Sequence, residues 1–284
     1  MSTVTVTTKT PETPEPSSAP RPAYRVTGLR VLRSEWAKLW SLRSTWITLG
    51  LALLFLVAVG LIAATQYKSQ FGSGKPMDDD FGGATAVSLA LFGTTFAQLA
   101  LGVLGVLGTA GEYSTGMIRS TLAAVPRRLP VLWSKSAVFG AVALAVGTLG
   151  AFGTFLFANG IVDGTDAAVG FSDAGVVRSL LGAGLYLGLV GVMGAALGAL
   201  LRSVAGGISV LVAALMLIPG LVQLLPSSWQ DNISPYLPGN AGGSMYALTQ
   251  DATTLSPTAG TLVFLGWTVL ALAGAAYRLV RRDV

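Results

Sequence analysis

The sequence contains no cysteine and no histidine among its 284 residues. Without cysteine the chain cannot form disulfides or thiolate metal sites, and without histidine it lacks the commonest metal ligand and proton shuttle. A His-Glu-x-x-His metalloprotease and a serine protease with a histidine base are excluded for the same reason. An intramembrane protease is therefore the weakest of the functions that we consider.

Charged side chains are also scarce. They make up 11% of the chain, against 52% hydrophobic residues, and the mean hydropathy is +0.67. A chain of this length with so little polar material cannot cover a soluble surface, so the composition indicates a membrane protein. The isoelectric point near 9.7 does not indicate a nucleic-acid partner, because the basic residues lie at segment ends without interleaved aromatics.

Six apolar runs reach the roughly 20 residues that a helix needs to cross a bilayer. They cover residues 46–65, 85–110, 136–159, 179–201, 204–225 and 259–279. We therefore expect residues 25–284 to form one all-α transmembrane domain. Residues 1–24 are rich in Thr, Pro and Ser and contain no apolar run, which predicts a disordered tail and does not resemble a signal peptide.

The distribution of charge predicts the orientation of these spans. If the N-terminus is cytoplasmic, Lys68, Lys75 and Arg178 fall outside and the other 15 of the 18 basic residues fall inside. The aspartates at 78–80, 163, 166, 173, 231 and 251 all fall outside. By the positive-inside rule, both termini should be cytoplasmic, in a multi-pass protein of the cell membrane.

A short amphipathic helix is predicted over residues 29–42, before the first span. Its apolar side carries Leu29, Leu32, Trp36, Leu39 and Trp40. Arg33 and Lys38 lie on the other side, and two tryptophans suit the headgroup region of a bilayer. We interpret it as an interfacial helix; a core helix of a soluble domain is the alternative.

Polar and small residues share single faces of several spans. In the second span this stripe consists of Thr95, Gln98, Gly102, Gly105 and Thr109. Because lipid does not favour such a face, the stripe should face protein or a cavity, and we expect it to line a transport pathway or a subunit seam. Glycines at 140, 147 and 150 and at 184, 188, 191 and 198 predict close helix packing instead of ligand contacts.

The fifth span and the segment after it contain irregular features. Arg202 and Ser203 leave room only for a very tight turn, and Pro219-Gly220 predicts a kink. Residues 226–258 are longer than a simple turn requires, and their aromatic residues make them amphipathic enough to dip into the outer leaflet. A solvated loop is the alternative.

The segment from Gly111 to Lys135 joins two apolar runs and concentrates charge. Ser114, Thr115 and Gly116 should interrupt the preceding helix, since Gly is costly in a helix interior. Apolar residues then recur at helical spacing, which predicts a short amphipathic helix over residues 117–124 that ends before Pro126. We expect the break to bring Glu112 and Arg119 together as an ion pair. A positive loop that only sets topology is the alternative.

This segment resembles the cytoplasmic loop of ABC-2 type transporter permeases. The family pattern Glu-Tyr-x-x-Gly-x-x-Arg-x-x-Leu-x-x-x-Pro-x-Arg is matched by Glu112, Tyr113, Gly116, Arg119, Leu122, Pro126 and Arg128. Met117 departs from it, because a small hydroxyl residue is expected there. The stretch SEWAKLWSLRSTW is similar to the connecting helix before the first span, and residues 226–258 are similar to the re-entrant outer segment of ABC-2 and ABCG-type transporters.

The resemblance implies an ABC-2/ABCG-like transmembrane domain that acts as the permease subunit of an exporter. It further implies a second permease copy and cytoplasmic ABC ATPase subunits that bind ATP and Mg. The loop that couples ATP hydrolysis to transport would consist of Glu112, Tyr113, Gly116, Met117, Ile118, Arg119, Leu122, Pro126, Arg127 and Arg128. The substrate is not implied.

The residues themselves also favour an external energy source. The central parts of the six spans contain no Asp or Glu, which proton-coupled carriers generally need. Sodium coupling through backbone carbonyls stays open, but it would need broken helices at paired positions of two halves, and only the fifth span looks interrupted. The stretch Gly72-Ser73-Gly74-Lys75 is too short for a phosphate-binding loop, so we expect no cofactor, metal or catalytic residue on this chain. A secondary, ion-coupled transporter is the alternative function.

Overall fold

The computed structural model describes residues 27–73, 81–125, 127–250 and 254–281. The predicted tail and Pro126 lie outside these ranges. Within them the protein is all-helical, and six helical segments are long and apolar enough to cross a membrane, as the sequence predicts. These segments are Arg43–Ser73, Ala86–Ser114, Leu129–Ile161, Val176–Leu201, Val204–Val222 and Pro257–Arg281.

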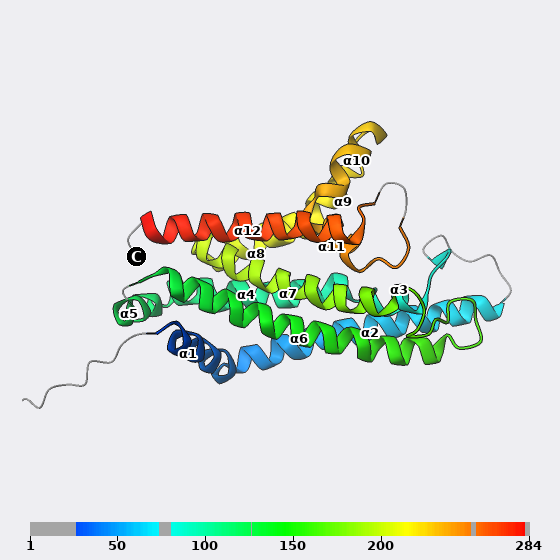
Figure 1. Ribbon diagram of the computed structural model, residues 1–284, viewed down its shortest axis with the longest axis horizontal. Coiled ribbons are helices and arrows are strands. Elements are labelled where there is room, and N and C mark those ends of the chain that lie inside the picture. The colour runs from blue at the N-terminus through cyan, green and yellow to red at the C-terminus, as the bar shows by residue number, and fades with distance from the viewer. Residues whose placement is uncertain (1–26, 74–80, 126, 251–253, 282–284) are drawn as a thin grey trace, which may run out of the picture.

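The helices run roughly along one long axis (Figure 1). In chain order they begin with α1 (Gly28–Ser41), α2 (Arg43–Ser73), α3 (Ala86–Leu91), α4 (Thr94–Ser114), α5 (Met117–Ala124) and α6 (Leu129–Ile161). They continue with α7 (Val176–Leu201), α8 (Val204–Val212), α9 (Ile218–Val222), α10 (Ser227–Ile233), α11 (Pro238–Tyr246) and α12 (Pro257–Arg281). Helices α1 and α5 and the last turns of α12 lie at the same end of the bundle, which we call the α5 end.

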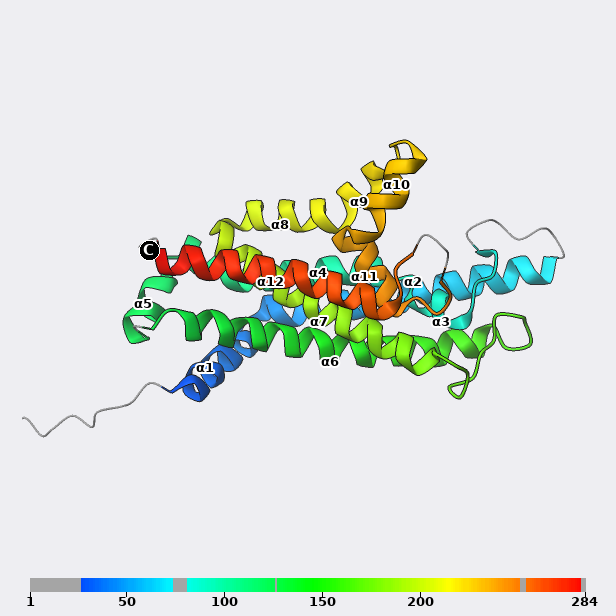
Figure 2. The ribbon, with the colours of Figure 1, turned by 45° about the horizontal axis from the view of Figure 1, so that its top comes forward.

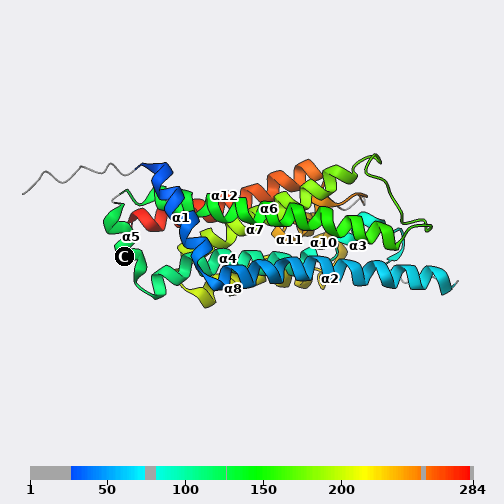
Figure 3. The ribbon, with the colours of Figure 1, turned by 90° about the horizontal axis from the view of Figure 1, so that it is seen from below.

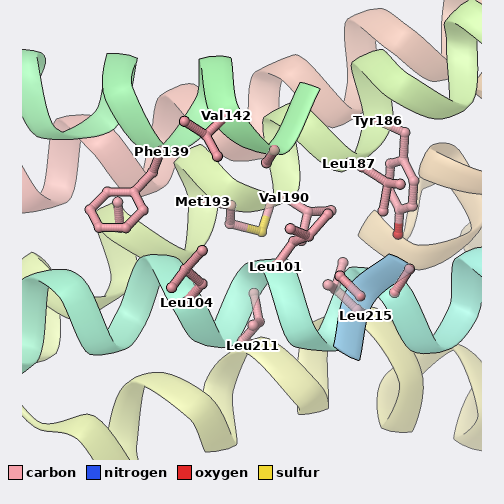
Figure 4. Packing of buried hydrophobic residues seen from close by; sticks show 14 of the residues in the cluster. Leu101, Leu104, Phe139, Val142, Tyr186, Leu187, Val190, Met193, Leu211 and Leu215 are labelled. Atoms are coloured by element: carbon pink, nitrogen blue, oxygen red, sulfur yellow. The ribbon is translucent and has the colours of Figure 1, made fainter. Parts of the chain in front are cut away.

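Helix α7 is the centre of the bundle and packs against α4, α6 and α12. Its buried side chains include Tyr186, Leu187, Val190 and Met193, which meet Leu101 and other residues of α4 and α6 in one apolar core (Figure 4). Because lipid tails are as apolar as these side chains, close packing rather than the hydrophobic effect must hold the helices together.

Glycines allow that close packing, as the sequence predicts. A Cβ at Gly105 would lie 2.5 Å from the carbonyl oxygen of Gly191 and 2.7 Å from the amide nitrogen of Ala195, both on α7. A Cβ at Gly188 would lie 2.8 Å from Cβ of Leu144 on α6. The backbones of α4, α6 and α7 therefore touch where a side chain would separate them.

Two interruptions shape the remaining spans. The second span breaks between α3 and α4. At this break the chain lies against α2, where a Cβ at Gly93 would lie 2.5 Å from the carbonyl oxygens of Phe55 and Leu56. The sequence predicts no break there. The fifth span widens into a π-helix at Ala213–Leu217 just before Pro219, whose missing N–H cannot continue the α-helical pattern. This irregularity lies beside the kink that the sequence predicts.

The segment after the fifth span folds back onto the bundle. Helix α10 projects away from it, whereas α11 lies against α7 and α12 (Figure 2). Ala241 and Met245 are buried in the core, and Gly242 allows the ring of Tyr186 to approach. The α11 part of this segment is therefore not a simple solvated loop, and it packs on α7 and α12; insertion of the segment into the outer leaflet stays a prediction.

Candidate functional site

The corner between α4 and α6 is built by a chain reversal around α5. Gly116 has a φ of 73°, a left-handed conformation that suits glycine, and it separates α4 from α5. Helix α5 covers Met117–Ala124, as the sequence predicts, and no side chain caps its start at Gly116. Helix α6 begins at Leu129 with a proline in its first turn and returns antiparallel to α4. The reversal brings Lys135 beside Glu112.

Four charged side chains from three helices meet at this corner. The Nζ of Lys135 lies 2.6 Å from Oε2 of Glu35 and 3.0 Å from Oε1 of Glu112. The Nζ of Lys38 lies 2.7 Å from Oε1 of Glu35 and 3.2 Å from Oε1 of Glu112. This cluster, which we call the ion network, ties α1 to α4 and α6 (Figure 3 shows α1 crossing the bundle).

The ion network also contacts α5 and the backbone. Lys38 donates to Oγ1 of Thr121 on α5 at 3.4 Å, and Lys135 donates to the carbonyl oxygen of Gly108 at 3.2 Å. Both ammonium groups therefore have three acceptors, which matches their three N–H bonds. Glu35, Glu112 and Lys135 are 4%, 5% and 3% exposed. Charges buried this deeply are tolerated only when they are paired, so the network locks the relative positions of its helices.

Neighbouring opposite charges lower the pKa of Glu35 and raise the pKa of Lys38, the two members of the ion network on α1. Burial alone would raise the pKa of Glu35, but the ammonium groups of Lys135 and Lys38 outweigh it and lower this pKa. Burial would lower the pKa of Lys38, but the carboxylates of Glu35 and Glu112 raise it. Both groups are therefore charged across the physiological range.

We expect the contributions of Glu35 and Lys38 to the stability of the protein to be constant between about pH 5.5 and 9.5. The contribution of Glu35 is complete above its ordinary pKa of 4.5 and is lost as the pH falls through its lowered folded pKa. The contribution of Lys38 is complete below its ordinary pKa of 10.5 and is lost as the pH rises through its raised folded pKa. Unfolding measured in one detergent from pH 3 to 11 checks this. A stability change near pH 7 that Glu35→Gln abolishes would contradict it.

The expected ion pair between Glu112 and Arg119 is wrong. Among the described residues, Glu112 pairs with Lys38 and Lys135, while Arg119 lies exposed on α5. The turn at Gly116 starts α5 in a new direction but does not fold Arg119 back onto the carboxylate. The buried partners come instead from α1 and α6, which Glu112 can reach without leaving the bundle.

The other residues of the predicted coupling loop have distinct environments. The ring of Tyr113 lies under the guanidinium of Arg202, 5.1 Å from its centroid, and Arg128 donates to the carbonyl oxygen of Leu279 at 3.1 Å. Arg202 itself has a φ of 55° in the tight turn after α7. Ile118 is buried and Leu122 is half-buried, whereas Met117 and Arg127 are exposed. The surface of α5 thus presents Met117 and Arg119.

Only part of the predicted apolar side of α1 is buried against the bundle, and the rest is exposed. Leu39 is buried with Val31 and Glu35 on the face that meets the bundle. Leu29, Leu32 and Trp36 are exposed, and Trp40 is half-buried between Trp36 and Trp46. The outward-facing apolar residues suit an interfacial helix, while the inward face carries a carboxylate where the sequence predicts none.

The polar stripe of α4 mostly faces protein of the same chain. Gln98 accepts a hydrogen bond from the hydroxyl of Tyr186, Gly102 and Gly105 pack on α7 and α8, and Thr109 is buried. Thr95 is exposed. Gly102 and Gly105 therefore form an intramolecular seam in this structure.

Glu35 is the member of the ion network that the sequence does not predict. A signal for it exists, because Glu35 and Glu112 are isolated acids within segments that are otherwise basic. Glu35 also follows Val31 and precedes Leu39 by one helical turn, which places it on their face. An acid on the apolar face of a basic helix indicates a buried cationic partner.

The described residues contain no group of three or more carboxylates that could hold a metal ion. The site is instead a charge-neutral structural junction beneath a short, exposed helix. In comparisons with known proteins, no protein-family model matched this chain and no curated protein matched it.

Proposed function

We propose that this chain is the membrane-spanning permease subunit of an ATP-driven exporter, with α5 as the element that receives force from a separate ATPase. The observation that carries the proposal is the junction at the α5 end. There, a helix of eight residues is presented outside the bundle, directly above an ion network that joins α1, α4 and α6.

The mechanism follows from the stiffness of this junction. A push on Met117 or Arg119 passes through the α4–α5 turn and through the contact of Thr121 with Lys38. From there it reaches Glu112 and Lys135, which belong to the two helices that pack on α7. Because breaking the network would leave charges buried without partners, the helices should move together as one body.

The energy source is expected on another chain. The central parts of the spans lack acidic residues and the whole sequence lacks histidine, which disfavours proton coupling and leaves an ion-coupled carrier as the second candidate. The charge asymmetry of the sequence supports a cytoplasmic α5 end. A second permease copy would pack on apolar surface that the fifth span and α12 leave exposed, including Leu217, Leu221 and Leu270.

Exposed residues of α5 should matter for coupling but not for folding. We expect Met117→Ser and Arg119→Ala to retain the wild-type unfolding midpoint, because both side chains are exposed, and to reduce the ATP hydrolysis of the co-purified ATPase or its coupling to export severalfold. Arg33→Ala on α1 is the matched control, since it removes another exposed arginine at the same end.

The measurement is the amount of ATPase that co-purifies, its hydrolysis rate and the export of the compounds that stimulate it, all on the same preparations. If hydrolysis and export were unchanged in both α5 variants, the alternative would hold, namely that the segment is a positive loop that only sets topology. A loss in Arg33→Ala equal to that in Arg119→Ala would show that surface charge at this end, and not α5, is what the partner requires.

A further inference from the structure

Helix α1 leaves one of its faces uncovered by the described part of the chain. It runs across the bundle axis instead of along it, and its other face is buried against the bundle (Figure 3). The uncovered face carries three apolar side chains that are 77%, 36% and 46% exposed, namely Leu29, Leu32 and Trp36. An exposed apolar face of this kind indicates contact with a membrane or with another protein.

This face continues onto the spanning helix α2. The ring centroid of Trp40 lies 5.5 Å from that of Trp36 and 4.8 Å from that of Trp46, so one row of rings, which we call the tryptophan row, joins the two helices. Trp46 and Ile47 are 60% and 64% exposed at the start of α2, which is long and apolar enough to span a membrane. The tryptophan row therefore lies where a lipid-facing surface begins, as tryptophan does at membrane interfaces, and lipid is its natural neighbour.

Two arginines accompany the tryptophan row. Arg33 precedes Trp36 by three residues on α1, and Arg43 precedes Trp46 by three residues on α2. Residues three apart lie on the same side of a helix, so each arginine neighbours a ring of the row. Both arginines are exposed, and among the described residues no ion pair involves either of them. Guanidinium groups in this position can bind the phosphates of lipid headgroups.

The ion network removes the acids that could neutralise these arginines. Among the described residues, the carboxylates at the α5 end are Glu35 and Glu112, and both are buried and paired with lysines. The described aspartates lie between α6 and α7 and on α10, away from the α5 end (Figure 1). The surface beside the tryptophan row is therefore positive, which favours an anionic headgroup over a zwitterionic one that brings its own cation.

We propose that α1 and the first turn of α2 bind anionic phospholipids of the leaflet at the α5 end. Arg33 and Arg43 contact the headgroup phosphates, and the tryptophan row lies beside the upper part of the acyl chains. The inference requires only that the chain spans a membrane and does not rest on the proposed function.

The test measures quenching of tryptophan fluorescence by lipids that carry bromine in the upper part of their acyl chains. The other three of the six tryptophans are exposed, so the full chain with Trp133→Phe, Trp229→Phe and Trp267→Phe should fold and report on the tryptophan row alone. Liposomes of phosphatidylcholine contain brominated phosphatidylglycerol or brominated phosphatidylcholine at the same mole fraction. We expect at least about a fivefold preference for phosphatidylglycerol, which one arginine at a membrane surface provides, and a smaller preference in about 0.5 M NaCl.

Arginine variants in this background assign the preference to α1 and α2. Arg33→Gln combined with Arg43→Gln should abolish the preference and keep the unfolding midpoint, because both side chains are exposed. Arg281→Gln is the control, since it removes an exposed arginine at the same end from α12, which lies on the other side of the bundle from α1 (Figure 1). The control should keep the full preference.

Three results would overturn the proposal. One is equal quenching by the two brominated lipids, which would show contact with lipid but no selection of the anionic headgroup. Another is a preference that survives in the folded double variant or that falls equally in Arg281→Gln, which would assign it to the net charge of the chain. The third is quenching by neither lipid, which would show that protein covers the tryptophan row.

Discussion

Lys135→Met should cost about 3–5 kcal/mol in the free energy of unfolding, because it leaves two buried carboxylates with only one cation. Lys135 is as deeply buried as Glu35 and contacts both Glu35 and Glu112. Methionine keeps the volume of the side chain, so the loss reports the charge and not a cavity. Titration of the purified protein with SDS, followed by circular dichroism, measures it.

Two companion variants separate this effect from general damage. Lys38→Met removes the other cation, whose side chain is 33% exposed. Because water screens this charge, the loss in the free energy of unfolding should be smaller than for Lys135→Met. The double variant Glu35→Met with Lys135→Met removes one charge of each sign and should recover most of the stability, because Lys38 and Glu112 remain paired. A double variant as unstable as Lys135→Met would contradict the pairing.

Gly105→Ala should strongly destabilise the seam between α4 and α7, where the two backbones are in contact. Its Cβ would lie 2.5 Å from a carbonyl oxygen and 2.7 Å from an amide nitrogen of α7, and neither backbone atom can move aside as a flexible side chain can. We expect a loss of about 3 kcal/mol or more, at the upper end of overpacking costs, and a poor yield of folded protein.

Gly153→Ala is the matched control on α6. No atom lies within 4 Å of its built Cβ, and alanine is the better helix former, so stability should be unchanged or slightly higher. Yield from detergent extraction and the SDS midpoint distinguish the two variants. Equal behaviour of Gly105→Ala and Gly153→Ala would mean that α4 and α7 do not touch as described.

Local patterns in the sequence predict much of this fold. The bounds of α5 follow from the glycine at 116 and the apolar spacing of residues 117–124, and α1 follows from its amphipathic spacing. Length and hydropathy suffice for the six spans because the bilayer sets both. Each of these features depends on residues within one continuous segment of the chain.

The features that the sequence does not predict depend on contacts between residues that are far apart along the chain. Glu35 and Lys135 are 100 residues apart, and nothing in the local pattern of either helix says that α1 crosses α6. Arg119 is the nearer cation along the chain, which is why it is the natural but wrong choice of partner for Glu112. The close approach of Gly93 to the backbone of α2 likewise joins segments that are far apart in the sequence.

The energy source of the protein is the most direct test of the proposed function. The measurement is ATP hydrolysis and export by proteoliposomes that contain the chain as purified from its native membranes in mild detergent, with and without ionophores that collapse proton and sodium gradients. We predict that an ATPase accompanies the chain, that export requires ATP, and that ionophores leave it unchanged. A chain that purifies without any nucleotide hydrolysis and exports only when an ion gradient is imposed would contradict the account and establish an ion-coupled carrier.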